Sequence, residues 1–279
     1  MSNTLILNST NVLGGATKNT YQYNFIGGNY HIKDDAEIAV SSITLPYSWF
    51  NVTTYYANKT FQFTWTSGGT LTTYTITLPD GFFSVNDINL YFQNYCIANG
   101  FYLINSLAQN VYYLSLSYNS NYYAVQLLEF AVPISLPSGY TQPSNFAGYP
   151  TTATTPQFII PATNSIGAII GFTAGTYGIG GTSNQSFLSN TTPNGTNVNS
   201  IVVRCSLVNN SVASPTDILD SFQITSSFGS NINYSPNFEK WIKLRKGTYS
   251  NFLISFYDQN LNQLQMNDTN VLITLLIKQ

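Results

Sequence analysis

The run Phe61-Gln62-Phe63-Thr64-Trp65 decides the fold, together with the run Tyr74-Thr75-Ile76-Thr77-Leu78 that follows it. In both runs, large apolar residues alternate with Gln or Thr at a period of two. Successive side chains of a β-strand point to opposite faces of a sheet, so this alternation is typical of a strand with one buried face. The Ser-Gly-Gly sequence at 67–69 is a turn signal. This part of the chain is therefore predicted to be β-structure.

The same pattern recurs toward both ends of the chain. Tyr21–Phe25 and Phe252–Tyr257 also alternate, while Val271–Ile277 is almost continuously apolar and predicts a strand buried on both faces. Further strands are expected at 37–45, 101–104, 111–117, 122–128, 201–208 and 222–226. Many short strands with few helices predict an all-β fold, either a sandwich or a barrel.

Two helices are expected between the strands. Ser84 is a suitable N-cap, Asp87 lies at the positive end of the helix dipole, and Gly100 ends the segment. The apolar stripe of this helix consists of Val85, Ile88, Phe92 and Cys96. A second, short helix is expected over 165–172. Neither helix carries enough apolar surface to organise a domain.

The composition favours a protein that associates with its neighbours. The chain has 279 residues, of which 43% are hydrophobic and only 7% are charged, and its net charge is −2. About a quarter of the residues are charged in ordinary globular proteins. Polarity comes instead from Asn, Ser, Thr, Gln and 21 Tyr residues. Such a surface neither attracts nucleic acid broadly nor keeps copies apart by repulsion, so contact with nucleic acid is disfavoured.

The charge distribution suggests where the chain divides. No Asp, Glu, Lys, Arg or His occurs from Phe130 to Val203, and this stretch is rich in Pro, Gly, Thr and Asn. Long loops of this kind in a compact domain are usually functional or disordered. We therefore expect a first half of one β-sandwich at 1–104, an inserted β-rich and loop-rich region at 105–200, and a second half at 201–279. The core of the sandwich is expected to contain Trp49, Trp65 and the Phe252, Ile254 and Phe256 row.

The residues predict no catalytic, cofactor or metal site. His31 is the single histidine, and its context predicts a partly exposed strand residue. Asp34, Asp35 and Glu37 lack the spacing of a calcium loop and indicate a solvated turn. Asp217 and Asp220 are the candidate acid/base pair of a glycosidase, but a turn or helix-start role is favoured. Gly175–Gly181 is glycine-rich without the Lys-Ser/Thr of a phosphate loop.

The one basic concentration is Lys240–Lys246. On a strand, Trp241, Lys243 and Arg245 would share one face, which could contact nucleic acid. The favoured alternative is a strand with one solvated face, whose lysines discourage edge pairing. The sequence assigns a definite role neither to this run nor to His31.

Cysteine and targeting signals are few. Cys96 and Cys205 are far apart and are expected to be buried free thiols. The N-terminus lacks the basic and apolar segments of a signal peptide, and no apolar run approaches the roughly 20 residues that cross a bilayer. A soluble protein made in the cytoplasm is expected.

Three stretches together resemble a known family. The first is Tyr21–Phe25 followed by IAVSSITLPYSWFN at 38–51, the second is NSIGAIIGFTAGTY at 164–177, and the third is LRKGTYSNFLISFYD at 244–258 followed by 270–273. In order and spacing they resemble the penton, or vertex minor capsid, proteins of virophages, polinton-like elements and related large DNA viruses. The likeness covers residues 1–100 and 157–279, and it does not extend to 105–155 and 180–200.

The resemblance implies a structural role. Family members form a single jelly roll, assemble as homopentamers and occupy the five-fold vertices of an icosahedral capsid between capsomers of the major capsid protein. It implies further contacts with other minor capsid or fibre proteins, and a location in the virion after synthesis in the host cytoplasm. No enzymatic activity and no cofactor are expected. Individual interface residues do not follow from the resemblance.

Two other function classes remain open from the residues alone. A glycan- or receptor-binding β-sandwich, such as a lectin-like fibre domain, would use exposed Tyr and Trp rings to stack on sugars. A glycosidase would use Asp217 and Asp220, although these residues lie in no recognisable site. Assembly as pentamers would favour the vertex role, whereas a monomer at every concentration would favour the attachment role.

Overall fold

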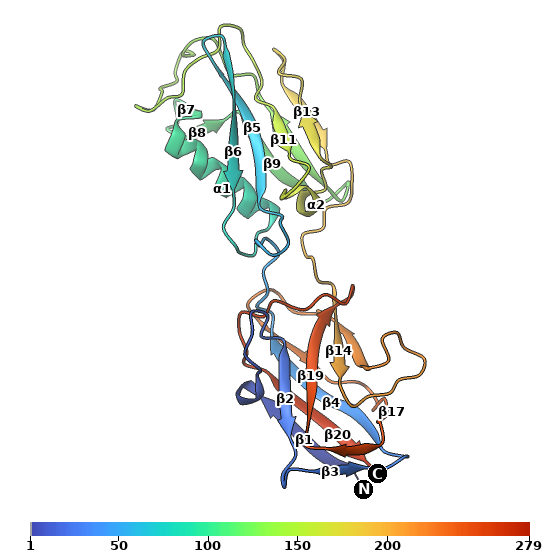
Figure 1. The fold of residues 1–279 in the computed structure, drawn as a ribbon. Coiled ribbons are helices and arrows are strands. Elements are labelled where there is room, and N and C mark those ends of the chain that lie inside the picture. Colours follow the sequence, from blue (N-terminus) through green and yellow to red (C-terminus); the bar gives the residue numbers. More distant parts are fainter. Residues whose placement is uncertain (1) are drawn as a thin grey trace. The chain divides into compact units, whose positions relative to one another are not determined.

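The computed structural model describes residues 2–279, and this part of the chain forms two compact units (Figure 1). Unit 1 joins the chain up to Trp49 to Val198–Gln279, and unit 2 is Phe50–Asn197. The boundaries predicted after residues 104 and 200 are therefore corrected to 49/50 and 197/198. The first differs most because the strands at 60–77 and the helix at 85–99 share a core with the region that follows them, rather than with the terminal segments.

Unit 1 contains strands from both ends of the chain. Their bounds are β1 Ser2–Asn8, β2 Thr20–Asn24, β3 Tyr30–Ile32, β4 Glu37–Pro46, β14 Ser200–Cys205, β15 Ile218–Gln223, β16 Asn231–Tyr234, β17 Ile242–Lys243, β18 Gly247–Tyr249, β19 Asn251–Asp258 and β20 Leu272–Lys278, with a 3-10 turn at Ser9–Asn11. One sheet has the order β1-β20-β4-β16, with β17 also paired to β4. A second has the order β15-β14-β19-β2, and β3 pairs with β18.

The two main sheets of unit 1 each bury one row of side chains. The rows of the two central strands are Phe252, Ile254 and Phe256 on β19, and Ile273, Leu275 and Ile277 on β20. Because the opposite face of β20 stays partly open, with Leu272 47% exposed, the prediction that this strand is buried on both faces is wrong. Phe222 of β15 stacks on Tyr234 of β16 with ring centroids 4.4 Å apart, so the sheets are in contact. The all-β class and the sandwich architecture predicted from the alternation are confirmed.

Unit 2 contains the remaining strands and both helices. Their bounds are β5 Thr60–Ser67, β6 Thr70–Thr77, α1 Val85–Asn99, β7 Tyr102–Ile104, β8 Asn110–Tyr112, β9 Leu114–Asn119, β10 Ala124–Glu129, β11 Phe158–Ile160, α2 Gly167–Ile170, β12 Gly175–Tyr177 and β13 Gln185–Leu188. One sheet has the order β12-β11-β5-β6, a second has the order β13-β10-β9, and β7 pairs with β8. The strand expected over 111–117 is two strands, separated at Tyr113.

Helix α1 begins and ends as the sequence predicts. Ser84 accepts a hydrogen bond from the backbone N–H of Asp87, and the Asp87 carboxylate accepts one from the N–H of Ser84, which forms a capping box. Ile88, Phe92 and Cys96 are buried on the unit 2 core, and Val85 packs at its margin. Gly100 ends the helix with φ 74°, and a Cβ there would lie 2.0 Å from the carbonyl oxygen of Asn145. Only glycine therefore fits this position without a backbone shift.

Aromatic rings fill the core of unit 2. The ring of Phe63 lies 5.2 Å from those of Phe92 and Phe101 and 5.5 Å from that of Tyr74, measured between centroids. Trp65 is 2% exposed and contacts Phe101. Trp65 thus belongs to unit 2 and not to the sandwich of the terminal segments, where it was expected. Trp49 and the row Phe252, Ile254 and Phe256 lie in unit 1 as predicted. The core prediction therefore fails only for Trp65, which lies beyond the corrected boundary.

The two ends of unit 2 are tied together at Asn51. Its carbonyl oxygen accepts a hydrogen bond from the Asn197 side chain at 2.8 Å, and its own side-chain amide donates to the carbonyl of Gly195 at 2.8 Å. Asn51 is 1% exposed, so these bonds satisfy a buried amide. The segment that enters unit 2 and the segment that leaves it therefore lie side by side.

Candidate functional site

The acidic cluster of unit 1 is divided between two separate ion pairs. Asp34 lies in an exposed turn and pairs with Lys246 at 2.7 Å, whereas Glu37 begins β4 and pairs with Lys278 at 2.8 Å. Asp35 is exposed in the same turn. The predicted solvated turn is confirmed. Within residues 2–279, no group of three Asp, Glu, His or Cys side chains is arranged to hold a metal ion.

His31 is an exposed residue of β3, as its sequence context predicts. Its Nδ1 lies 3.2 Å from the hydroxyl of Thr248 on the paired strand β18, and its carbonyl accepts a hydrogen bond from the Gln279 side chain. Within the described residues, no hydrogen bond joins the His31 side chain to a cysteine or a carboxylate. The arrangement is that of a cross-strand polar pair.

Asp217 and Asp220 are engaged separately, each by its own cation. Asp217 receives two hydrogen bonds from the Arg204 guanidinium at 2.9 and 2.7 Å, and this carboxylate raises the pKa of Arg204. Asp220 is 7% exposed and accepts from Lys240 at 2.9 Å and from the Tyr234 hydroxyl at 2.8 Å. Neither carboxylate is left free to act as an acid or base, which argues against the glycosidase alternative.

The expected turn role is confirmed for Asp217, which lies in a turn, and it is wrong for Asp220. Asp217 directly precedes β15, and Asp220 lies inside that strand. A buried acid is tolerated there because Lys240 and Tyr234 neutralise and solvate it. Strand β15 runs from Ile218 to Gln223 and pairs with β14, so it begins earlier than the strand expected at 222–226.

The basic run 240–246 does not form one continuous strand. Only Ile242–Lys243 pairs with β4. Lys240 is bound to Asp220, Lys246 is bound to Asp34, and the Arg245 guanidinium donates to the carbonyl of Val208. Because its cations are dispersed onto different partners, this run presents no shared basic face. The shared face of Trp241, Lys243 and Arg245 does not form, and the strand with one solvated face is limited to Ile242–Lys243, where Lys243 is exposed.

The glycine-rich run 175–181 lies against a buried acid. Glu129, the last residue of β10, has no exposed surface, and neither of its carboxylate oxygens has a hydrogen-bond partner within the described chain. A Cβ at Gly178 would lie 2.0 Å from Glu129 Oε2, so this glycine makes room for the carboxyl group. Burial raises the pKa of Glu129 to about 8. The carboxyl is therefore protonated at neutral pH.

Both cysteines are buried free thiols, as the sequence predicts. Cys96 lies on the inner face of α1, and Cys205 ends β14. Burial raises the pKa of both thiols, that of Cys205 to about 12. Neither thiol is the low-pKa, accessible kind that acts as a nucleophile.

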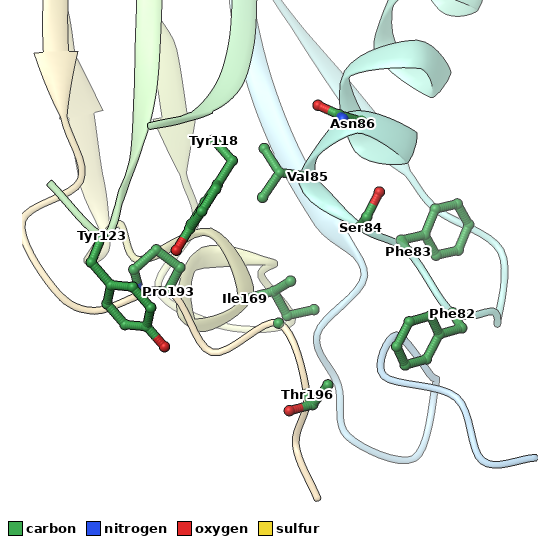
Figure 2. A pocket seen from close by; sticks show the side chains of 11 residues that line it. Phe82, Phe83, Ser84, Val85, Asn86, Tyr118, Tyr123, Ile169, Pro193 and Thr196 are labelled. Atoms are coloured by element: carbon green, nitrogen blue, oxygen red, sulfur yellow. The ribbon is translucent and has the colours of Figure 1, made fainter. Parts of the chain in front are cut away.

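An apolar pocket of about 420 Å³ opens on unit 2, between the start of α1 and the β9–β10 turn (Figure 2). Tyr118, Tyr123 and Pro193 lie on one side of it, and Phe82 and Phe83 lie on the other. The Tyr118 and Tyr123 rings are 46% and 65% exposed, with centroids 6.3 Å apart. Tyr123 has φ 48°, a backbone conformation that bulky residues rarely adopt and that recurs at functional sites.

The outer face of the sheet β1-β20-β4-β16 is a surface on unit 1 with few charges. Ile6 and Leu272, 55% and 47% exposed, lie on it with Thr4, Thr274 and Leu276. Ser42 and Thr44 continue it on β4, and the ion pair of Lys278 with Glu37 lies at one end of it. Away from that pair, such a surface can contact another protein without desolvating ions.

The sequence interpretation identified neither of these two surfaces. The pocket and the outer face depend on which strands pair, and no local motif encodes that. Exposed tyrosines in the Tyr122-Tyr123 turn were the one signal available for the pocket. No helix among the described residues has the length and apolar character that crossing a bilayer requires.

No known family model matches the sequence, and no curated protein sequence matches it. Among solved structures, the chain is similar to a crystal structure of the SeMet-labelled mavirus penton protein, at 12% identity and a TM-score of 0.44, covering 100% of this chain and 98% of that one. It is also similar to a chain of the Sputnik virophage structure determined by cryo-EM at 12% identity and a TM-score of 0.41, covering 99% and 97%. At these scores the likeness by itself carries no conclusion about function.

Proposed function

We propose that this chain is a structural protein of a viral capsid, and that unit 1 is a single jelly roll. The strand order of unit 1 carries the proposal. Numbering its eight principal strands along the chain, with β3, β17 and β18 left out as short pairings, turns the two sheets into 1-8-3-6 and 5-4-7-2. The pairs 1·8, 2·7, 3·6 and 4·5 are all antiparallel. One long hairpin wrapped into two sheets has these pairs, and such a double-sheet jelly roll is found in capsid and lectin domains.

The proposed assembly is a homopentamer at the five-fold vertices of an icosahedral capsid, between capsomers of the major capsid protein. A five-fold ring joins two unlike patches of each copy, so the subunit needs two complementary surfaces. The uncharged, Tyr-, Thr- and Asn-rich composition supports this, because Tyr supplies contact area at low entropic cost. In this proposal the protein resides in the virion after synthesis in the host cytoplasm, contacts other minor capsid or fibre proteins, and catalyses no reaction.

Native mass spectrometry and sedimentation of the purified chain test the assembly. We expect a five-copy species whose fraction rises with protein concentration. Co-expression with the major capsid protein provides a second arm, in which cryo-EM should place the chain at the vertices. A chain that stays monomeric alone and is also absent from the resulting particles would overturn the proposal.

A second candidate function, attachment to a glycan or receptor, is favoured by the Tyr118 and Tyr123 pocket. Exposed aromatic rings beside an apolar hollow are suited to stacking on a sugar face. A glycan array should then show binding that Tyr123→Ala abolishes and Tyr55→Ala preserves, since Tyr55 is a 58% exposed tyrosine of unit 2 outside the pocket. An array without hits would leave the capsid role alone.

A further inference from the structure

Strand β6 is the last strand of its sheet, and one of its two edges has no strand beside it. It pairs with β5 over its whole length, from Thr60 opposite Thr77 to Ser67 opposite Thr70, without a shift in register. Every second residue of such a strand directs its backbone N–H and C=O toward the partner, and the others direct these groups away.

The hydrogen bonds show which residues face outward. The N–H of Leu78 donates to the carbonyl of Lys59 at 2.9 Å, so Leu78 and the even-numbered residues of β6 face β5. The odd-numbered residues Leu71, Thr73 and Thr75 therefore direct their backbone groups to the open edge. No backbone partner for these groups occurs within residues 2–279. The exception is the carbonyl of Thr77 at the end of the strand, which accepts a hydrogen bond from the Tyr91 hydroxyl.

This open edge lacks the usual protection against pairing. Exposed edges are normally blocked by charges, prolines, bulges or covering elements. Two other edge strands of this chain are protected in this way. Strand β15 carries the buried acid Asp220. Strand β9 is covered by α1, where the Asn89 side chain accepts a hydrogen bond from the N–H of Leu116 at 2.8 Å. Thr70–Thr77 contains no charge and no proline, and Leu71 is 57% exposed. The edge is open over three outward-facing residues.

A second uncharged edge lies at β13, in the other sheet of unit 2. The N–H of Ser189 donates to the carbonyl of Val125, so Gln185 and Phe187 face β10, and Ser186 and Leu188 face outward. Ser186 and Leu188 are both exposed. In Figure 1, β13 lies at one margin of unit 2, whereas β6 lies beside α1, away from β13. One copy thus presents two different open edges, one in each sheet of unit 2.

We propose that the open edge of β6 pairs with the open edge of β13 in a second copy of this chain, so that sheets continue from subunit to subunit. The inference deepens the proposed function, on which the presence of a second copy rests. Main-chain hydrogen bonds supply the attraction in strand addition whatever the side chains. Neither edge carries a charge that would repel the other copy. Pairing of unlike edges is a heterologous contact, which gives a ring where the rotation between copies closes and an open filament where it does not, rather than a two-fold dimer.

A charge-swap experiment tests this pairing. Thr73→Lys and Ser186→Lys each place an ammonium group on one open edge at an exposed side chain, and Ser186→Lys also removes the hydrogen bond that the Ser186 hydroxyl accepts from the Gln126 side chain. Each variant should lose the multi-copy species in native mass spectrometry, under conditions where the unaltered chain is assembled. The double variant Thr73→Lys with Ser186→Glu should recover it, because the two new charges then meet across the contact. Thr73→Val, which keeps the shape and the N–H, is the matched control.

Hydrogen exchange supplies an independent readout. The amides of Leu71, Thr73 and Thr75 should exchange quickly in the monomer and become protected on assembly, whereas Thr72 and Tyr74, already bonded to β5, should change little. Retention of five-copy rings by Thr73→Lys would overturn the edge pairing and leave the capsid role standing. A two-copy species would also overturn the edge pairing. The lack of any assembly, with or without the major capsid protein, would overturn both the edge pairing and the proposed function.

Discussion

The two units handle charge in opposite ways. Unit 1 holds eight of the nine Lys and Arg residues and eight of the eleven Asp and Glu residues, whereas unit 2, with 148 residues, holds only Lys59, Asp80, Asp87 and Glu129. In unit 2, Lys59 pairs with Asp80 at 2.6 Å, Asp87 caps α1, and Glu129 is buried. Lys59, Asp80 and Asp87 are thus engaged within the unit, and Glu129 is enclosed without a hydrogen-bond partner. Unit 1 is electrically balanced and cross-linked by ion pairs, and unit 2 is held together almost entirely by apolar packing.

This difference indicates where each unit is sensitive. A fold held by aromatic packing loses most when a ring is removed, and it responds little to salt. A fold that contains ion pairs responds to charge removal in proportion to how deeply each pair is buried. Substitutions and pH can therefore separate the two units.

The largest effect is expected from Phe63→Ala in unit 2. Phe63 is 1% exposed and contacts four rings, so its truncation should lower the free energy of unfolding of this unit by about 3–5 kcal/mol. Phe256→Ala, at a fully buried ring of unit 1, is the matched change. Amide hydrogen exchange should accelerate within 50–197 for the first variant and within the terminal segments for the second. Equal acceleration in both units by either variant would contradict separate cores.

The pH dependence of unit 2 should come next in size. The pKa of Glu129 is about 8 in the folded chain and near 4.5 when unfolded, so the folded state holds the proton more tightly. The stabilisation is then complete below about pH 4.5 and is lost as the pH rises toward 8, at a slope approaching about 1.4 kcal/mol per pH unit. Denaturant unfolding followed in 50–197 at several pH values measures this slope.

Glu129→Gln should flatten this dependence, because the amide cannot ionise. Glu239→Gln, at an exposed glutamate of unit 1, is the control and should leave the slope unchanged. A unit 2 that is equally stable at pH 5 and pH 8 in the unaltered chain would show that Glu129 finds a partner when it ionises.

A smaller loss is expected in unit 1 from Asp220→Asn. The carboxylate accepts from Lys240 and Tyr234 and is 7% exposed, whereas the Lys240 side chain is 46% exposed and can return to water. We expect a cost of about 1–3 kcal/mol, typical of a hydrogen bond to a charged group. Chemical denaturation reports it, with Asp35→Asn as the exposed control. No change in the midpoint would mean that the buried network does not stabilise β15.

The smallest effect is expected from Asp34→Asn. The side chains of Asp34 and Lys246 are 76% and 60% exposed, so their ion pair should contribute about 0–1 kcal/mol. Raising the salt concentration to about 1 M should remove most of this contribution, because the Debye length falls to roughly 3 Å. A decrease in melting temperature as large as that caused by Asp220→Asn would contradict the expectation that a more deeply buried ion pair contributes more to stability.

Local patterns predicted the elements better than the arrangement. Alternation located β2, β5 and β19, and the cap at Ser84 located α1, because these signals are carried by neighbouring residues. The boundary at 49/50 left no local trace. The sequence around Trp65 does not show which core this residue joins, and the long-range pairing of β5 with β11 places it in that of unit 2.

The candidate surfaces were hidden for a related reason. An open strand edge is defined by the strand that is missing beside it, so Thr70–Thr77 reads the same in the sequence whether its edge is covered or open. Glu129 was likewise one acid among eleven until the fold enclosed it. The dispersal of Lys240–Lys246 onto separate acids depends on contacts with residues 20 to more than 200 positions away.

The hydrogen bonds at Asn51 have an evolutionary consequence. Because the beginning and the end of unit 2 are joined there, the whole unit behaves as a cassette that a genome can enlarge, trim or exchange while the strands on either side, β4 and β14, keep their places. Selection can then act on one unit without disturbing the strand pairing of the other.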